Sequence, residues 1–216
     1  VSSTNKTFTV SCTPNFPFEE GKVYKMYGYN KSDNCFTYND DTNKRATYEG
    51  NKTEVNSKSY WTFEHISGTE NQFYVYNLGA KMYLALRDAR DYASFVTESG
   101  TISNYSRVIR ITPNGNGFNL QHETGNACCG THMGGVVTTE TNSMGTWANS
   151  ASPSNDASRV FIYEINDELT ALANNPVTTG EYVGETTLPR LTTTAAAAGS
   201  NPTKENVLAV IDAMDN

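Results

Sequence analysis

Three copies of one alternating pattern run through the sequence, and this repeat restricts the fold more than any other feature. Each copy opens with a stretch in which apolar or aromatic side chains alternate with polar ones, as on a half-buried β-strand. These stretches start at Tyr24, Phe73 and Phe118, which are 49 and 45 residues apart. A second strand-like stretch follows a turn in each copy, at residues 35–37, 83–85 and 128–130. Because the spacing persists, we treat the three copies as equivalent units.

A serine two residues before a large apolar side chain gives the third mark of each copy. The marks are Ser59-x-Trp61, Ser106-x-Val108 and Ser158-x-Val160, at offsets of 47 and 52 residues. After the first two marks, short turns at 67–69 and 113–117 lead directly into the next copy. One copy cannot bury its own apolar face, but three copies around an axis can. The sequence therefore predicts an all-β fold, a β-trefoil of three pseudo-repeats, in which three hairpins cap a closed six-stranded barrel.

The repeat also sets the expected domain boundaries. We place the β-trefoil at residues 21–166, with copies at about 21–71, 72–116 and 117–166. Residues 1–20 contain one short apolar stretch, 7–10, followed by prolines that break regular structure. We predict a short N-terminal strand or a linker there.

Residues 167–216 are predicted as a partly helical C-terminal appendage or linker. One or two helical turns are expected at 167–173, and a 12-residue helix is expected after Thr203 as N-cap. The apolar face of that last helix is formed by Val207, Val210, Ile211 and Met214. No element is predicted for the Thr-rich stretch between these helices, which ends in the alanines 195–198. The appendage either docks on the trefoil or begins a further domain.

Charge and hydropathy exclude several function classes. The net charge is −7, whereas binding to a phosphate backbone needs clustered Lys and Arg, so we expect no nucleic-acid partner. No apolar run approaches the roughly 20 residues that cross a bilayer, and no membrane span is predicted. The sequence shows neither an initiator Met nor a signal-peptide pattern. We therefore expect a secreted or cell-envelope protein whose signal peptide has been removed.

The sequence offers little that indicates catalysis. No metal-ligand spacing, phosphate loop or nucleophile motif appears, so no metal and no cofactor are predicted. The histidines are expected to be structural, and the carboxylate pairs are expected to lie in solvated turns. For the cysteines, disulfides and buried free thiols are both open. These cysteines are Cys12, Cys35, Cys128 and Cys129.

The hairpin of the second copy carries a family resemblance. Residues 73–77 and 81–85 resemble the "F-x-I-x-N…x-K-Y-L" hairpin of ricin-type β-trefoil lectin modules. Ser59-x-Trp61 stands where that family carries Gln-x-Trp, and many bacterial relatives joined to secreted glycan-degrading enzymes carry Ser there. The resemblance covers about two thirds of the chain. It implies a β-trefoil, a glycan or polysaccharide partner, and in some relatives a linked catalytic domain.

The family's sugar-holding residues do not transfer to this chain. The position of the sugar-binding Asp is occupied by Thr37, Ala85 and Gly130 in the three copies, and the Gln is Ser in each. Any glycan site is therefore expected to be built differently. Sugar sites on trefoils are shallow, with an aromatic face that stacks on a pyranose while a carboxylate and an amide hold its hydroxyls.

Two polar regions hold residues of these kinds. Trp147 with Asn149 and Asp156 lies in a polar loop of the third copy, where the Trp serves either as a barrel plug or as a stacking platform. The second copy offers Asp88, Asp91 and Tyr92, with a surface salt-bridge loop as the alternative. Asp40 and Tyr48 are the corresponding candidates in the first copy, and Trp61 is assigned to packing.

The predicted function is a non-catalytic, carbohydrate-binding module of a secreted bacterial glycan-processing protein. One alternative is a protein-binding or inhibitor trefoil, which predicts an exposed apolar patch near one set of loops. The other is a structural spacer attached to a catalytic domain.

Overall fold

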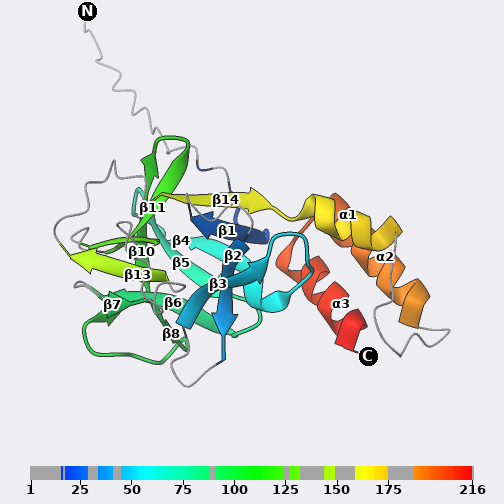
Figure 1. Ribbon diagram of the computed structural model, residues 1–216, viewed down its shortest axis with the longest axis horizontal. Coiled ribbons are helices and arrows are strands. Elements are labelled where there is room, and N and C mark those ends of the chain that lie inside the picture. The colour runs from blue at the N-terminus through cyan, green and yellow to red at the C-terminus, as the bar shows by residue number, and fades with distance from the viewer. Residues whose placement is uncertain are drawn as a thin grey trace, which may run out of the picture.

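The computed structural model describes most of the chain. The described residues are 16, 18–28, 34–40, 45–87, 91–123, 127–131, 144–148, 159–174 and 187–215, with the backbone alone at 127–131, 146–148, 187–188 and 215. The strand predicted at 7–10 lies outside them. Figure 1 shows a body of strands with a group of helices at one end.

Six strands close into a barrel within the described part of the chain. In order around the ring they are β1 (Tyr24–Gly28), β4 (Trp61–His65), β5 (Gln72–Asn77), β10 (Val108–Asn114), β11 (Gly117–His122) and β14 (Val160–Glu164). Each strand pairs antiparallel with the next, and β14 pairs back with β1. The predicted closed barrel is confirmed.

Three hairpins supply the other long strands of the described structure. They are β2 (Asn34–Asn39) with β3 (Arg45–Asn51), β6 (Met82–Arg87) with β8 (Ser94–Val96), and β12 (Ala127–Thr131) with β13 (Met144–Ala148). Two-residue strands β7 (Asp91–Tyr92) and β9 (Tyr105–Ser106) pair with β13 and β6, and the 3-10 turn η1 (Ser57–Ser59) precedes β4. The fold is a β-trefoil, as the sequence repeat predicts.

The period-two alternation along the barrel strands explains the core. The inward side chains are at most 3% exposed, and burial of each contributes about 1.5–3 kcal/mol. They include Tyr24, Met26, Phe63, Phe73, Val75, Ile109, Ile111, Leu120 and Val160. Trp61 is fully buried, and its Nε1 donates to the Phe36 carbonyl at 3.2 Å. The packing role predicted for Trp61 is confirmed.

In the second copy, the serine mark predicts the inward-facing residue of β10 wrongly by one position. Trp61 and Val160 point into the barrel, whereas Val108 is half-buried and Ile109 takes the inward position. Arg107 forms a bend between β9 and β10 that accommodates the extra residue. Because side chains alternate between the faces of a strand, this shift turns Val108 to the outer surface.

Among the described residues, three helices follow the barrel: α1 (Asn166–Asn174), α2 (Thr187–Ser200) and α3 (Lys204–Asp215). The helices predicted at 167–173 and after Thr203 are confirmed, and Thr203 Oγ1 caps α3 by accepting from the Asn206 N–H at 3.2 Å. Met214 departs from the predicted apolar face because it is 47% exposed, while Val207 and Val210 are buried. None of the helices in the described ranges has the length and hydropathy to span a membrane.

Helix α2 occupies the Thr-rich stretch for which the sequence pattern predicts no element. Its small residues allow a close crossing with α1, since a Cβ at Gly199 would lie 2.7 Å from Thr170 Oγ1 and 3.0 Å from Thr170 N. Ala195 and Ala198 are fully buried in a second core with Leu169. The alanine run is therefore a helix-packing face.

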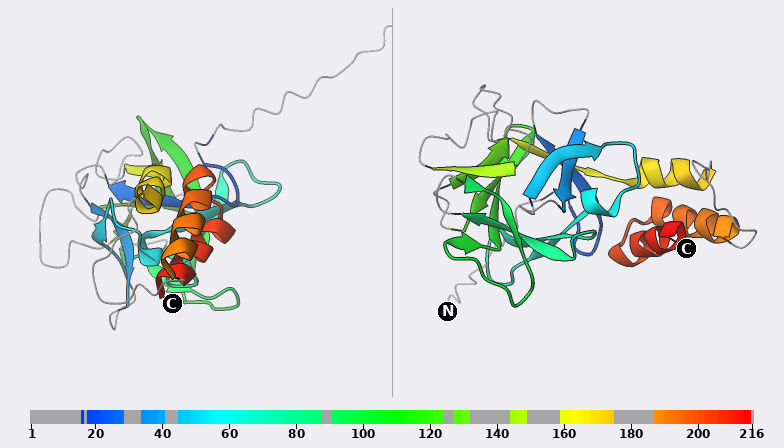
Figure 2. Two further views of the ribbon diagram at one scale, coloured as in Figure 1. Left: turned by 90° about the vertical axis from the view of Figure 1, so that its right-hand side faces the viewer. Right: turned by 60° about the horizontal axis from the view of Figure 1, so that its bottom comes forward.

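The helices dock on one end of the barrel (Figures 1 and 2). Their second core includes the trefoil side chains Val23, Tyr60 and Leu78. The Val23 N–H donates to the Pro202 carbonyl at 2.8 Å, and the Lys204 N–H donates to the Gly21 carbonyl at 2.9 Å. Of the two expectations for the appendage, docking on the trefoil is the one observed for these helices.

Candidate binding surface

The structure places three of the six predicted ligand-binding residues. Asp91 and Tyr92 form β7, and the backbone of Trp147 lies in β13. The other three lie outside the described residues: Asp88, Asn149 and Asp156.

Trp147 lies in a strand, and its prediction as a loop residue is wrong. It pairs with Cys128 of β12, while its own strand pairs with β7 along the other edge, where Thr146 lies opposite Asp91. Pairing on both edges keeps this polar, Gly-containing segment extended, although its composition alone does not favour a strand. The strands that carry candidates from the second and third copies are therefore neighbours.

Asp91 lies in a network of charged and aromatic neighbours. One carboxylate oxygen accepts from Arg87 Nη1 at 2.5 Å, and the other accepts from the Tyr92 N–H at 2.8 Å. The Arg87 and Asp91 side chains are 35% and 32% exposed. Burial raises the pKa of Asp91, but the hydrogen bonds from Arg87, Tyr92 and Tyr105 outweigh it, and the pKa lies below its ordinary value. The salt-bridge alternative for this loop is observed for the Arg87–Asp91 pair.

Tyr92 and Tyr105 join this network to the first copy. The Arg45 guanidinium lies 3.6 Å from the centroid of the Tyr92 ring, and the Tyr105 hydroxyl donates to the Tyr92 carbonyl at 3.1 Å. Burial, assisted by the charge of Asp91, raises the pKa of Tyr105 to about 12. The phenol is therefore a donor at neutral pH. We name Arg45, Arg87, Asp91, Tyr92 and Tyr105 the Asp91 cluster.

An open hollow of about 290 Å³ lies beside the Asp91 cluster. Its walls are Val96, the segment 98–102 that follows β8, and the segment 105–108 at the start of β10. Tyr105 belongs both to this wall and to the cluster. Sites for drug-sized molecules span about 300–1,000 Å³, and this hollow lies just below that range, so its volume limits a ligand to about one sugar ring. We name this feature the repeat-two hollow.

The repeat-two hollow combines hydrogen-bond acceptors and donors. Arg107 donates to the Glu98 carbonyl, and its guanidinium lies 5.0 Å from the Tyr74 ring centroid. Burial raises the pKa of Tyr83, and the charges of Glu64 and Glu98 raise it further. Exposed Ser99 and Thr101 add hydroxyl groups. The one-residue shift in the second copy creates part of this wall, since it turns Val108 outward.

Sequence reasoning missed several residues of this surface and overestimated the first copy. Glu98 and Tyr105 lie in the polar turn that precedes Ser106, Arg107 is the middle residue of the Ser106-x-Val108 mark, and nothing in the sequence singles out Arg45. Tyr48 is wrong as an exposed candidate, because it is 3% exposed and its ring centroid lies 4.1 Å from that of Phe36. Asp40 is exposed and accepts from the Tyr38 hydroxyl at 2.9 Å.

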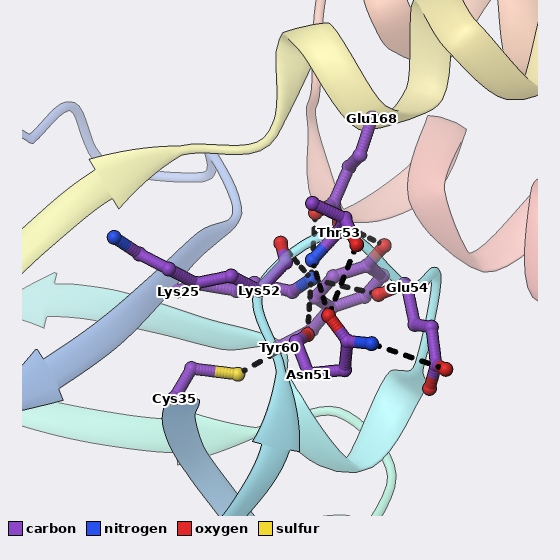
Figure 3. A network of polar contacts seen from close by, with 8 residues as sticks. All are labelled: Lys25, Cys35, Asn51, Lys52, Thr53, Glu54, Tyr60 and Glu168. Atoms are coloured by element: carbon purple, nitrogen blue, oxygen red, sulfur yellow. Dashed lines mark hydrogen bonds and ion pairs between the residues drawn. The ribbon is translucent and has the colours of Figure 1, made fainter. Parts of the chain in front are cut away.

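A second group of titratable side chains is sealed between the barrel and α1 (Figure 3). Lys25 is fully buried, and its Nζ lies 2.6 Å from Glu168 Oε2. It also donates to three backbone carbonyls at 2.7–3.2 Å, those of Asn51, Lys52 and Glu54. The Tyr60 hydroxyl donates to the other Glu168 oxygen at 2.5 Å. We name Lys25, Glu168 and Tyr60 the Lys25 clasp.

The Lys25 clasp is a structural device and not a ligand site. Burial raises the pKa of Glu168 even though Lys25 opposes the shift, and burial also raises the pKa of Tyr60. The charged and polar atoms of the clasp are hydrogen-bonded to one another and to the backbone, so the group holds α1 on the barrel. At its edge Cys35 is a buried free thiol, with Sγ 3.5 Å from the Asn51 carbonyl. The side chains of the other three cysteines lie outside the description.

Comparison with known proteins supports the fold and leaves the family open. No family model matches the sequence, and no curated protein matches it either. Solved β-trefoil structures are similar to it, including the BEL β-trefoil, with a TM-score of 0.52, 12% identity, and 69% of this chain aligned to 97% of the other.

The similar structures also include a lectin and an agglutinin. The Polyporus squamosus lectin, solved with the epitope Neu5Acα2-6Galβ1-4GlcNAc, has a TM-score of 0.55 and 12% identity over 91% of this chain and 75% of its own. The Rhizoctonia solani agglutinin has a TM-score of 0.50 and 8% identity over 69% and 99% of the two chains. At these identities the likeness shows the fold alone: a β-trefoil of the kind found in carbohydrate-binding lectins.

Proposed function

We propose that this chain is a non-catalytic carbohydrate-binding module whose glycan site is the repeat-two hollow with the adjoining Asp91 cluster. The hollow itself carries the proposal, because an acidic residue, an arginine and hydroxyl-bearing residues line a volume of about 290 Å³: Glu98, Arg107, Ser99, Thr101 and Tyr105. A carboxylate accepts, a guanidinium donates, and hydroxyls do both, which matches the donors and acceptors of sugar hydroxyls. The tyrosine rings at the rim offer faces to the apolar side of a pyranose.

The biological setting is part of the same proposal. Similarity in fold to named lectins supports sugar binding. The ricin-type hairpin pattern supports a secreted or cell-envelope protein of bacterial glycan processing, with a linked catalytic domain. Trp147, Asn149, Asp156 and Asp88 stay predicted ligand contacts of the proposed module.

A glycan array followed by calorimetry tests the proposal. The wild-type chain should bind at least one sugar at millimolar concentration or below. Glu98→Gln should weaken that binding by about 10- to 100-fold, because a hydrogen bond to a charged group contributes about 1.5–3 kcal/mol. Glu70→Gln is the matched control, since Glu70 is an exposed carboxylate in the turn before β5. Absence of any bound sugar would favour a protein-binding trefoil or a spacer, and equal affinity of the two variants would show that the sugar site is not the repeat-two hollow.

A further inference from the structure

A group of three tyrosines lies on the outer face of the barrel next to the repeat-two hollow. Tyr74 and Tyr76 alternate with core residues on β5, and Tyr83 of β6 pairs directly with Tyr76. The Tyr83 ring centroid lies 5.9 Å from that of Tyr74 and 5.0 Å from that of Tyr76, both edge to face. All three side chains are half-buried. Residues two apart on a strand are about 7 Å apart, so these rings extend along the strand. We name them the tyrosine row.

The tyrosine row is continuous with the hollow. Val96 and Val108 line the hollow, and their β partners are Tyr83 and Tyr74. Arg107 bridges the two features, since its guanidinium lies 5.0 Å from the Tyr74 centroid and 5.5 Å from the Tyr83 centroid. A ligand in the hollow that continues past Arg107 therefore reaches the row directly.

The far end of the tyrosine row meets the helical appendage. Lys204, the first residue of α3, has its Nζ 4.3 Å from the Tyr76 ring centroid. The row thus ends against a donor supplied by a helix that follows the trefoil in sequence. Docking of the appendage, secured by the Lys25 clasp, sets this end of the surface.

We propose that the hollow and the tyrosine row form one extended site for a linear, uncharged glycan of several rings, an inference that rests on the proposed function. One ring occupies the hollow, and the following rings lie along Tyr83, Tyr74 and Tyr76, with Lys204 at the far end. Arg107 and Lys204 lie near the ring faces and are half-buried, so a sugar that stacks on these rings has to displace their charged ends.

The charges along this surface favour an uncharged chain. Two cations, Arg107 and Lys204, alternate with two carboxylates, Glu98 and Glu64. Glu64 lies directly opposite Tyr74 in the register, and its charge adds to burial in raising the pKa of Tyr76. The two cations and two carboxylates balance, so an acidic glycan gains no net attraction from this surface, whereas neutral hydroxyls pair with either sign.

Calorimetric titration with oligosaccharides of increasing length, a length series for each sugar, tests the extended site separately from the proposed function. The probes are xylose to xylotetraose, glucose to cellotetraose and N-acetylglucosamine to chitotetraose, with oligogalacturonides as the acidic comparison. In the series that binds, the trisaccharide should bind at least about tenfold more tightly than the monosaccharide, and the oligogalacturonides should bind more weakly. Equal affinity for one ring and three would overturn the extended site while leaving the glycan site in place. Absence of binding to every probe would overturn both.

Single substitutions test whether the higher affinity for the trisaccharide comes from the tyrosine row. Tyr74→Ala should reduce trisaccharide affinity to that of the monosaccharide and leave monosaccharide affinity unchanged. Tyr27→Ala is the matched control, because Tyr27 is a half-buried outer-face tyrosine on β1 that also lies under a lysine, Lys52, at 3.9 Å. Lys204→Ala gives a second readout and should weaken only the tetrasaccharide. Equal effects of the Tyr74 and Tyr27 changes on the trisaccharide would contradict the assignment.

Discussion

Replacing Lys25 with methionine tests whether the Lys25 clasp holds the appendage on the barrel. The Lys25 side chain is 0% exposed and that of Glu168 is 6% exposed, so the change leaves a buried carboxylate without its cation. Removal of one partner from a buried ion pair costs about 3–5 kcal/mol. For a chain of this size that loss lowers Tm by about 6–20 °C, at about 2–4 °C for each kcal/mol.

The assay is urea unfolding followed by circular dichroism at 222 nm, with the double variant Lys25→Met, Glu168→Leu as the comparison. Replacing both members of a buried pair by apolar groups is often neutral, so the double variant should recover much of the lost stability. Lys58→Met, at an exposed lysine of η1, is the control and should change stability by less than about 0.5 kcal/mol. A loss below about 1 kcal/mol for Lys25→Met, or a double variant as unstable as the single one, would refute the clasp.

Three further changes probe other parts of the structure. Asp91→Asn should cost about 0.5 kcal/mol at pH 7, as expected for a partly exposed ion pair. Because the folded pKa of Asp91 is lowered, its contribution is present above about pH 4 and is lost as the pH falls through the folded pKa, so the difference from wild type in urea titrations should shrink as the pH is lowered from 4. Gly199→Ala should destabilise the chain by about 1–3 kcal/mol in the same titration, since the new Cβ meets the Thr170 backbone; an unchanged midpoint would contradict the close crossing of α1 and α2. Cys35 should resist iodoacetamide at pH 8 until urea unfolds the chain, because burial raises its thiol pKa and shields it, and rapid labelling of the native protein would show that it is accessible.

The barrel was predictable because one physical signal occurs three times. Alternation at Tyr24, Phe73 and Phe118 marks the strands that open each copy, and the serine marks locate the strands that close it. The error at Val108 has a definite cause: a single extra residue at Arg107 changes which side chain faces inward. Because the serine marks are already 47 and 52 residues apart, their spacing does not reveal a shift of one residue.

The appendage shows where local patterns fail. Helix α3 has a cap at Thr203 and an apolar face, so it could be predicted. Helix α2 is rich in Thr, which has a low helix propensity, and its buried side chains are alanines, with Leu191 packed beside them. What stabilises α2 is close contact with α1, and that contact exists only in the tertiary structure.

The candidate site was predictable only where charge and aromatic residues are adjacent in sequence. Asp91 and Tyr92 were found in this way. Their partner Arg45 comes from another copy of the repeat, and Lys204 reaches the tyrosine row from the appendage. Residues that lie far from their partners in sequence form no local pattern with them, so these contacts can be recognised only in the folded structure.

Mapping a bound sugar onto the chain by amide NMR shifts tests the central claim most directly. The titrant is the tightest-binding oligosaccharide of the length series, added to uniformly ¹⁵N-labelled protein. The largest shifts should fall on residues 98–108, which line the repeat-two hollow, and on 74–83, which carry the tyrosine row. Shifts confined to the β2–β3 hairpin, to the third copy or to the helices, with 98–108 unchanged at saturation, would contradict it.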